Sequence, residues 1–180
     1  MSGNYTTQNS LLLDNLLKFY NKNNNLQKIL PIINGESEIS LRLIDWFVTN
    51  YAKKNFTVYK KGNERFKVYI DYKLKLKAYS KKRFDPFCRW DRINIPYGED
   101  TYIQTTIGQL NFFRWALENQ IIHYINENMK QIVNDMNKRN STSKKRKDIK
   151  KKTRKRREEL SICASKSIKK EKVEIVVNFD

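Results

Sequence analysis

The sequence has 180 residues, of which 39% are hydrophobic and 31% are charged, and its formal net charge is +18. This length fits one domain with an appendage, and the composition allows a modest hydrophobic core. The chain opens with no apolar leader and holds no run of about 18 apolar residues, so we expect an intracellular protein without a membrane span.

The cysteine and histidine content limits the metal chemistry. Cys88, Cys163 and His123 are the only residues of these two types, and they cannot form a tetrahedral zinc site without carboxylates. We expect both cysteines to be reduced and no cofactor to be bound.

The positive charge is concentrated in two blocks. Lysines and arginines minus aspartates and glutamates give 4 − 4 = 0 for residues 1–52, 14 − 4 = +10 for 53–92, 2 − 5 = −3 for 93–137, 17 − 4 = +13 for 138–172 and 0 − 2 = −2 for 173–180. Basic blocks of this density attract polyanions through counterion release. Nucleic acid is therefore the leading partner, ahead of an anionic membrane surface, and a solvated basic face without a partner is the plain alternative.

Residues 1–36 are predicted to form an N-terminal extension of helical and irregular segments. Apolar residues after Ser10 recur at helical spacing, which indicates a short amphipathic helix before the Asn-rich break at 21–25. They are Leu13, Leu16, Leu17 and Tyr20. The next apolar residues, from Leu26 to Ile33, flank Pro31 and are expected to cover the core as an irregular segment.

Residues 37–137 are predicted to form an α+β core domain. Its first helix should begin near Ser37, just after the Asn34-Gly35 turn. We expect a short strand over residues 56–59, a hairpin turn over 60–64 that contains Gly62, and a long strand from Arg65 onward.

The segment from Arg65 to Tyr79 alternates apolar and polar residues without a break. Period-two alternation is typical of a half-buried strand, although one of this length would span roughly 50 Å and should contain a bulge or bend. Its apolar members are Phe66, Val68, Ile70, Tyr72, Leu74, Leu76 and Ala78. The opposite side carries five basic groups and one carboxylate, Asp71, so it is a candidate surface for an anionic polymer.

An irregular link is predicted after Arg92, with Pro96 and Gly98 as breakers. Thr106 and Gln109 then have the spacing of a capping box, which begins a helix. Apolar residues recur at three- and four-residue steps after Thr106, so we expect one helix as far as about Asn137, lying on the sheet.

Residues 138–172 are predicted to be a basic flexible segment, because a run so rich in like charges cannot bury enough apolar area to order itself. Residues 173–180 again alternate like a strand. The predicted fold class is α+β: a small, mostly antiparallel sheet packed by two main helices, with a basic disordered insertion before a C-terminal strand. If that strand pairs with the sheet, the basic segment is held at both ends.

The basic residues predict a nucleic-acid interface that contacts phosphates with little sequence preference. The predicted contacts are Lys67, Lys73, Lys75, Lys77, Lys81, Lys82, Arg83, Arg89, Arg92, Lys144, Lys145, Arg146, Lys147, Lys150, Lys151, Lys152, Arg154, Lys155, Arg156 and Arg157. Aromatic residues interleaved with the first group could stack on unpaired bases, or could belong to the core. These are Tyr69, Tyr79, Phe84, Phe87 and Trp90. The same basic runs resemble a bipartite nuclear-import signal.

Three other functions are weighed against this one. Asp71-Tyr72-Lys73 on a strand loosely resembles the acid-x-Lys motif of restriction-endonuclease-like nucleases, with Glu64 or Glu38 as further Mg²⁺ ligands. The motif is short, and Asp71 could equally relieve repulsion between lysines. A Cys88 and His123 nucleophile pair is weaker, because a buried structural cysteine explains Cys88 better. A virion scaffold or adaptor protein is the third alternative. We expect no enzymatic activity.

Two stretches of the chain, AYSKKRFDPFCR and TIGQLNFFRWA, are the most specific of several across roughly residues 40–179. These stretches resemble a family of small basic proteins from nucleocytoplasmic large DNA viruses, the giant viruses. The resemblance implies a setting, the virus particle or the viral factory in the host cytoplasm, with the host nucleus as a further location, and it implies no mechanism or catalytic residue. This setting favours DNA over RNA as the partner, and genome packaging, condensation or nucleic-acid handling as the role, with other virion proteins as further partners.

Overall fold

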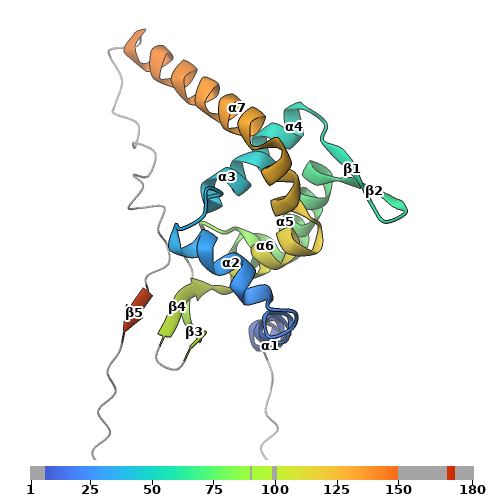
Figure 1. The fold of residues 1–180 in the computed structure, drawn as a ribbon, viewed down its shortest axis with the longest axis vertical. Helices are drawn as coiled ribbons and strands as arrows, with labels where there is room; N and C mark the ends of the chain where they lie inside the picture. The colour runs from blue at the N-terminus through green and yellow to red at the C-terminus, as the bar shows by residue number, and fades with distance from the viewer. Residues whose placement is uncertain (1–6, 90, 99–100, 150–169, 173–180) are drawn as a thin grey trace, which may run out of the picture.

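The computed structural model describes residues 7–89, 91–98, 101–149 and 170–172, of which 140–149 and 170–172 are described by their backbone only (Figure 1). Helices and strands alternate in groups along the chain. In order they are α1 Gln8–Tyr20, α2 Asn25–Asn34, α3 Leu41–Trp46, the π-helical turn η1 Phe47–Tyr51, α4 Ala52–Lys54, β1 Val58–Lys61, β2 Glu64–Lys67, α5 Val68–Phe84, β3 Arg92–Pro96, β4 Thr101–Thr106, α6 Ile107–Glu118, α7 Ile121–Ile149 and β5 Lys170–Lys172.

The α+β class is confirmed, with helices in the larger share of the described chain. The strands form two small antiparallel sheets, one of β1 and β2 and one in the order β3-β4-β5. The hairpin β1–β2 and the far end of α7 project from the body in different directions (Figure 1). The strands do not form the single sheet expected, because the longest expected strand is a helix.

The alternating segment from Arg65 is the main correction. Only Glu64–Lys67 is a strand, and residues 68–84 form α5. Val68 and Tyr72, one helical turn apart, are buried, whereas Ile70 and Leu74 are 53% and 60% exposed. A strand would have placed all four on one face. The lysines, leucines and alanine of the segment have high helix propensity, and packing of one helical side decides the outcome.

The buried side of α5 explains why the helix is preferred. Tyr72 packs against the rings of Phe84, Phe112 and Trp115, with centroid distances of 5.9, 6.3 and 5.9 Å. The Trp115 indole nitrogen donates a hydrogen bond to Asp71 Oδ1 at 2.6 Å. Asp71 therefore anchors α5 to α6, a contact that period-two alternation does not predict.

The N-terminal extension is more helical than expected. The predicted helix is present as α1, and it begins at Gln8 with Thr7 as its N-cap residue, whose hydroxyl accepts from the Ser10 amide at 3.2 Å. The segment predicted to be irregular is α2, which contains Pro31. Its buried isoleucines and leucines recur at helical spacing, and their burial outweighs the roughly 3 kcal/mol cost of an internal proline.

The helix predicted from Ser37 begins four residues later. Ser40 accepts a hydrogen bond from the Leu43 amide at 3.1 Å and is the N-cap residue of α3. Helical structure then continues through η1 and α4 to Lys54. The predicted turn is confirmed, since Gly35 ends α2 in the left-handed conformation with φ 74°.

Both short hairpins join strands in antiparallel register. The predicted turn at Gly62 joins β1 to β2, with Lys61 opposite Glu64. The link predicted to be irregular instead forms β3 and β4, with Ile95 opposite Ile103. Pro96 is tolerated there because it ends β3, an edge strand of its sheet.

The long helix predicted from Thr106 is two helices. The Thr106 hydroxyl accepts from the Gln109 amide at 3.1 Å, so the predicted cap is confirmed. The chain then turns at Asn119 and at Gln120, which has φ 58°, before α7 begins. The apolar period continues across this turn because Ile121, Ile125 and Ile132 face the same core as α6, and all three are fully buried.

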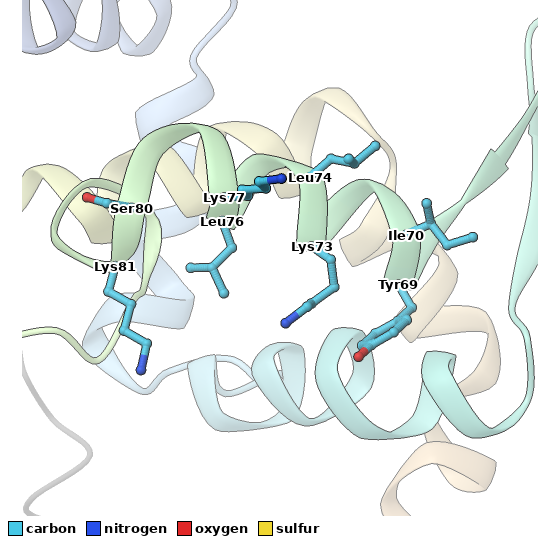
Figure 2. A pocket seen from close by; sticks show the side chains of 8 residues that line it. All are labelled: Tyr69, Ile70, Lys73, Leu74, Leu76, Lys77, Ser80 and Lys81. Carbon is cyan, nitrogen blue, oxygen red and sulfur yellow. The ribbon is translucent and has the colours of Figure 1, made fainter.

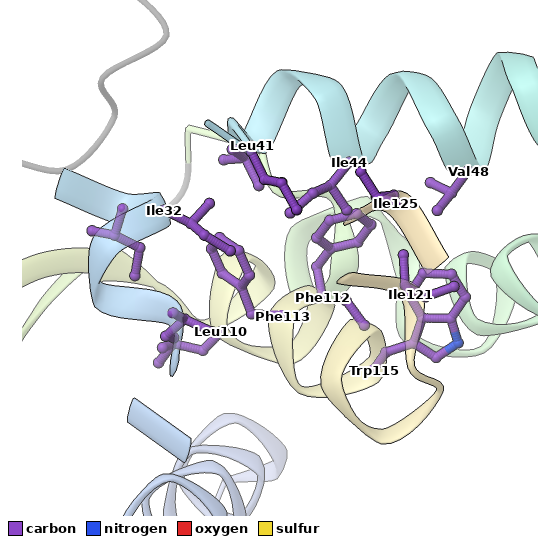
Figure 3. Packing of buried hydrophobic residues seen from close by; sticks show 14 of the residues in the cluster. Ile32, Leu41, Ile44, Val48, Leu110, Phe112, Phe113, Trp115, Ile121 and Ile125 are labelled. Carbon is purple, nitrogen blue, oxygen red and sulfur yellow. The ribbon is translucent and has the colours of Figure 1, made fainter. Parts of the chain in front are cut away.

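One hydrophobic core joins the helices. Side chains from α2, α3, η1, α6 and α7 meet in it, and Figure 3 shows Phe112 and Phe113 of α6 at its centre. Tyr20 extends the core to α1, because its hydroxyl donates to the Leu110 carbonyl oxygen at 2.5 Å. The core thus fixes α5 on the outside of α6, with one side of α5 exposed.

The basic segment 138–172 is partly described. The α7 backbone is helical through Ile149, so its first part is a helix, and residues 150–169 lie outside the described residues. The predicted C-terminal strand at 173–180 also lies outside them. Immediately before it, β5 pairs with β4, with Lys172 opposite Thr101. The chain therefore returns to the sheet in the last three residues of the basic segment.

Candidate nucleic-acid interface

The exposed side of α5 carries the first group of predicted phosphate contacts. Lys73, Lys75 and Lys77 extend from its middle turns and are exposed. Lys81 and Lys82 follow in the last turn, where positive charge suits the negative end of the helix dipole. Ser80, just before them, has φ 64° and lies outside the helical conformation, so Lys81 and Lys82 are set at a kink.

The hairpin β1–β2 extends this basic surface. Lys67, the last residue of β2, occupies the N-cap position of α5 and is exposed. Lys60 and Arg65, which pair across the hairpin, are exposed as well. Lys60 is not among the predicted phosphate contacts, because the turn expected from the sequence spans residues 60–64. Its place in the basic block 53–92 was the available signal.

The three arginines in the first group of predicted phosphate contacts differ in their surroundings. Arg83 is half-buried, and its Nε donates to Asn9 Oδ1 at 2.8 Å, so it joins the end of α5 to α1. Arg92 Nη1 donates to Gln104 Oε1 at 2.6 Å across the β3–β4 pair. Arg89 is exposed. Arg83 is thus engaged within the fold, whereas Arg89 and Arg92 lie on the surface.

The predicted stacking aromatics belong largely to the core. Phe84 is fully buried, and Tyr79 packs nearly parallel to it at a centroid distance of 6.0 Å. Tyr69 and Phe87 are half-buried against the same core. Trp90 lies outside the described residues. Phe84 therefore fits the core alternative, and Tyr69, Tyr79 and Phe87 are half-buried.

The second basic group is described only in part. Lys144, Lys145, Arg146 and Lys147 are consecutive residues of α7. Residues 150–157, with the other seven predicted contacts, lie outside the described residues. They are Lys150, Lys151, Lys152, Arg154, Lys155, Arg156 and Arg157.

The geometry assumed for the nuclease alternative is wrong. It required Asp71 and Lys73 on one face of a strand, but both lie in α5, where residues two apart point about 200° apart. Asp71 accepts from Trp115, and Lys73 is exposed. Among the described residues no group of three or more His, Cys, Asp and Glu side chains could hold a metal ion.

The predicted thiol and histidine are in separate surroundings. Cys88 is a half-buried free cysteine after α5, and its amide donates to the Asp85 carbonyl oxygen at 3.2 Å. His123 lies 3.3 Å from Glu127 on α7, and both side chains are largely exposed. Cys163 lies outside the described residues. The carboxylate of Asp85 accepts a hydrogen bond from the Phe87 amide at 2.9 Å.

Two carboxylates lie near the buried side of α5. Burial, together with the negative charge of Asp85, raises the pKa of the Asp45 carboxyl from 3.8 to about 6. Burial also raises the pKa of Tyr72, with Asp45 and Asp85 adding to the effect. The carboxylates of Asp45 and Asp85 therefore lie near the buried Tyr72 of α5.

The fold and this surface define the class: a small α+β protein with a lysine-rich helix and hairpin on one side. The chain belongs to a family of unknown function, DUF7197, whose model matches residues 2–179. It is 42% identical over 156 residues to uncharacterized protein L507 of Acanthamoeba polyphaga mimivirus. The aligned region covers 81% of this chain and 59% of the relative's length. The comparison with solved structures found no match.

The expected giant-virus family is thereby confirmed in this coarser form. The match begins well before residue 40, so the family extends over the N-terminal helices as well. No helix in the described part of the chain is long and apolar enough to cross a membrane.

Proposed function

We propose that this protein binds nucleic acid without strong sequence preference and without enzymatic activity, and that it prefers DNA. The distribution of charge carries the proposal: 17 − 4 = +13 over residues 138–172 and 14 − 4 = +10 over 53–92. In the block 53–92, Lys73, Lys75 and Lys77 are exposed on α5, beside the basic hairpin. Separate ammonium groups on a convex helix suit phosphates, since they offer no fixed pattern of donors for base edges.

The two blocks have different roles in this proposal. Residues 138–172 supply most of the affinity, because they carry the larger charge. The α5 helix and the hairpin, which are held by the core, orient the protein on the backbone. In a large DNA virus this activity serves genome packaging, condensation or nucleic-acid handling, in the particle or in the viral factory, and the basic runs also suit import into the host nucleus.

The test measures binding of the full chain to labelled single- and double-stranded DNA and to duplex RNA by fluorescence anisotropy. If six to ten basic groups contact phosphates, affinity for duplex DNA should fall by about 10³- to 10⁵-fold between 50 and 200 mM salt. Affinity should depend little on base sequence. Absent or salt-insensitive binding by the intact chain would contradict the proposal.

Glutamine variants separate the contributions of the two blocks. One variant replaces Lys144, Lys145, Arg146 and Lys147, and a second replaces Lys73, Lys75 and Lys77. Each lost phosphate contact should lower the logarithmic salt slope by about 0.9 on duplex DNA. A control replaces the exposed Lys18, Lys22 and Lys130, and its slope should be unchanged. Substitution is preferable to truncation, because removing the C-terminal residues would also remove β5 from its sheet.

A further inference from the structure

The outer side of α5 carries aliphatic residues that neither the core nor phosphate binding uses. Ile70 and Leu74 lie one helical turn apart and are 53% and 60% exposed. The opposite side of the helix already packs on α6 through Val68 and Tyr72, which are 0% and 6% exposed. Burial of Ile70 and Leu74 is therefore not needed to hold α5 in place.

These aliphatic residues line a hollow of about 630 Å³ along α5. Leu76 and Tyr69, both half-buried, form its inner margin, and Ile70 and Leu74 form its outer margin. Figure 2 shows Tyr69, Lys73, Leu76 and Lys81 on the side toward the helical segment that precedes β1. The lining holds three lysines, Lys73, Lys77 and Lys81, and no carboxylate.

This chemistry selects the kind of occupant. A phosphate backbone could use the lysines but would leave Ile70 and Leu74 in water. Unpaired bases need flat aromatic surfaces, and the one ring in the lining, Tyr69, is half-buried with Lys53 Nζ 5.6 Å from its centroid. A membrane surface suits protruding apolar residues, whereas these line a hollow.

We propose that this hollow binds an acidic amphipathic helix of a partner protein. Its apolar side chains, spaced three and four residues apart, would cover Ile70 and Leu74, and carboxylates along one side of it would meet Lys73 and Lys77. Ile70 and Leu74 distinguish this site from the proposed nucleic-acid surface, whereas Lys73 and Lys77 are shared by the two. The peptide and nucleic acid should therefore compete for α5.

The test uses the full chain and a labelled designed peptide of about 18 residues, long enough for five helical turns, with leucines on one side and glutamates beside them. Binding is measured by fluorescence anisotropy. The double variant Ile70→Ser with Leu74→Ser should weaken binding at least tenfold, and so should Lys73→Glu with Lys77→Glu. Leu11→Ser is the matched apolar control, since Leu11 is 50% exposed on α1. Lys130→Glu is the matched charge control.

Four further results decide the matter. The Ile70 and Leu74 double variant should keep its affinity for duplex DNA and its melting temperature, which separates this site from the proposed nucleic-acid function. A peptide with lysines in place of the glutamates should bind at least tenfold more weakly. Absence of peptide binding, or equal loss in Leu11→Ser, would overturn the proposal. Leu74-dependent binding to phosphatidylserine vesicles in place of the peptide would also overturn it and assign the hollow to lipid.

Discussion

The role of Asp71 is defined by its neighbours in the fold. In the sequence it is a single carboxylate among lysines, and both a metal ligand and a charge-relieving residue fit it. In the fold its Oδ1 accepts from the indole of Trp115, a side chain only 3% exposed. The contact links residues 44 positions apart, so no local pattern could have predicted it.

Replacing Asp71 with alanine should lower the free energy of unfolding by about 1–3 kcal/mol, because the buried indole nitrogen loses its acceptor. Asp71→Asn should recover much of this loss, since the amide oxygen can still accept. Chemical denaturation with tryptophan fluorescence measures both variants. Asp91→Ala, at an exposed position, is the control. Equal stability of Asp71→Ala and the wild type would contradict the anchoring role.

Asp45 should make stability depend on pH. Its pKa is about 6 in the folded protein against an ordinary 3.8, with burial the larger cause and the charge of Asp85 the smaller. The folded state therefore holds a proton that the unfolded state has lost between these values, so stability should fall as pH rises from about 4 to 6.

Asp45→Asn should remove this dependence. At pH 7 the variant should be more stable than the wild type by about 1–3 kcal/mol, and at pH 4 the two should be nearly equal. Urea unfolding at a series of pH values measures the effect, with the exposed Asp14→Asn as the control. A variant less stable than the wild type at pH 7 would show that Asp45 has a favourable partner when ionised.

Among the elements, the start of α6 packs unusually closely on the end of α5. A Cβ atom on Gly108 would lie 3.0 Å from the Lys82 carbonyl oxygen and 3.1 Å from that of Asp85. The Asn111 side-chain amide donates to the Arg83 carbonyl oxygen at 2.9 Å in the same region. Glycine at 108 thus permits the close approach that sets α5 on α6.

Gly108→Ala should lower the free energy of unfolding by about 1–3 kcal/mol, because backbone atoms on two sides must move. Thermal unfolding followed by circular dichroism measures the loss. The matched control is Gly62→Asn, at a left-handed position with open space around it, where asparagine is tolerated and stability should change little. A Gly108→Ala protein as stable as the wild type would mean that the two helices separate without cost.

Caps and turns were the elements best predicted from sequence, and the state of the longest segment was the worst. Thr106 caps α6 and Gly62 turns the hairpin as expected, because both signals act within four residues. Residues 68–79 alternate with period two and yet are helical. Among their alternating apolar residues only Val68 and Tyr72 are buried in the core, and these two lie one helical turn apart.

For the whole molecule, the pairing of β5 with β4 predicts that the two ends of the basic segment are held by the fold. After a tryptic cut within residues 150–157, the C-terminal fragment should stay bound to the body through this pairing. Size-exclusion chromatography followed by mass spectrometry would show both fragments in one peak, and they should separate in urea. Elution of the fragment alone in buffer would mean that β5 is not held.

The sequence by itself determined the quantities that depend on composition and on short spacings. These include the net charge of +18, its two blocks, the α+β class, the Thr106 cap, and the helical stripe of the N-terminal segment. It also showed most of the basic candidates, since lysine clusters are visible without any fold.

Only the tertiary structure decided which side of each segment faces the core. Packing against Phe112 and Trp115 made residues 68–84 a helix, buried Phe84, and engaged Arg83 with α1. The same packing left Ile70 and Leu74 exposed beside lysines. The free energy of burial depends on partners that are distant in the sequence. The period of the apolar residues, two or 3.6, shows only which sides of a strand or helix could be buried, and contact with the core decides between them.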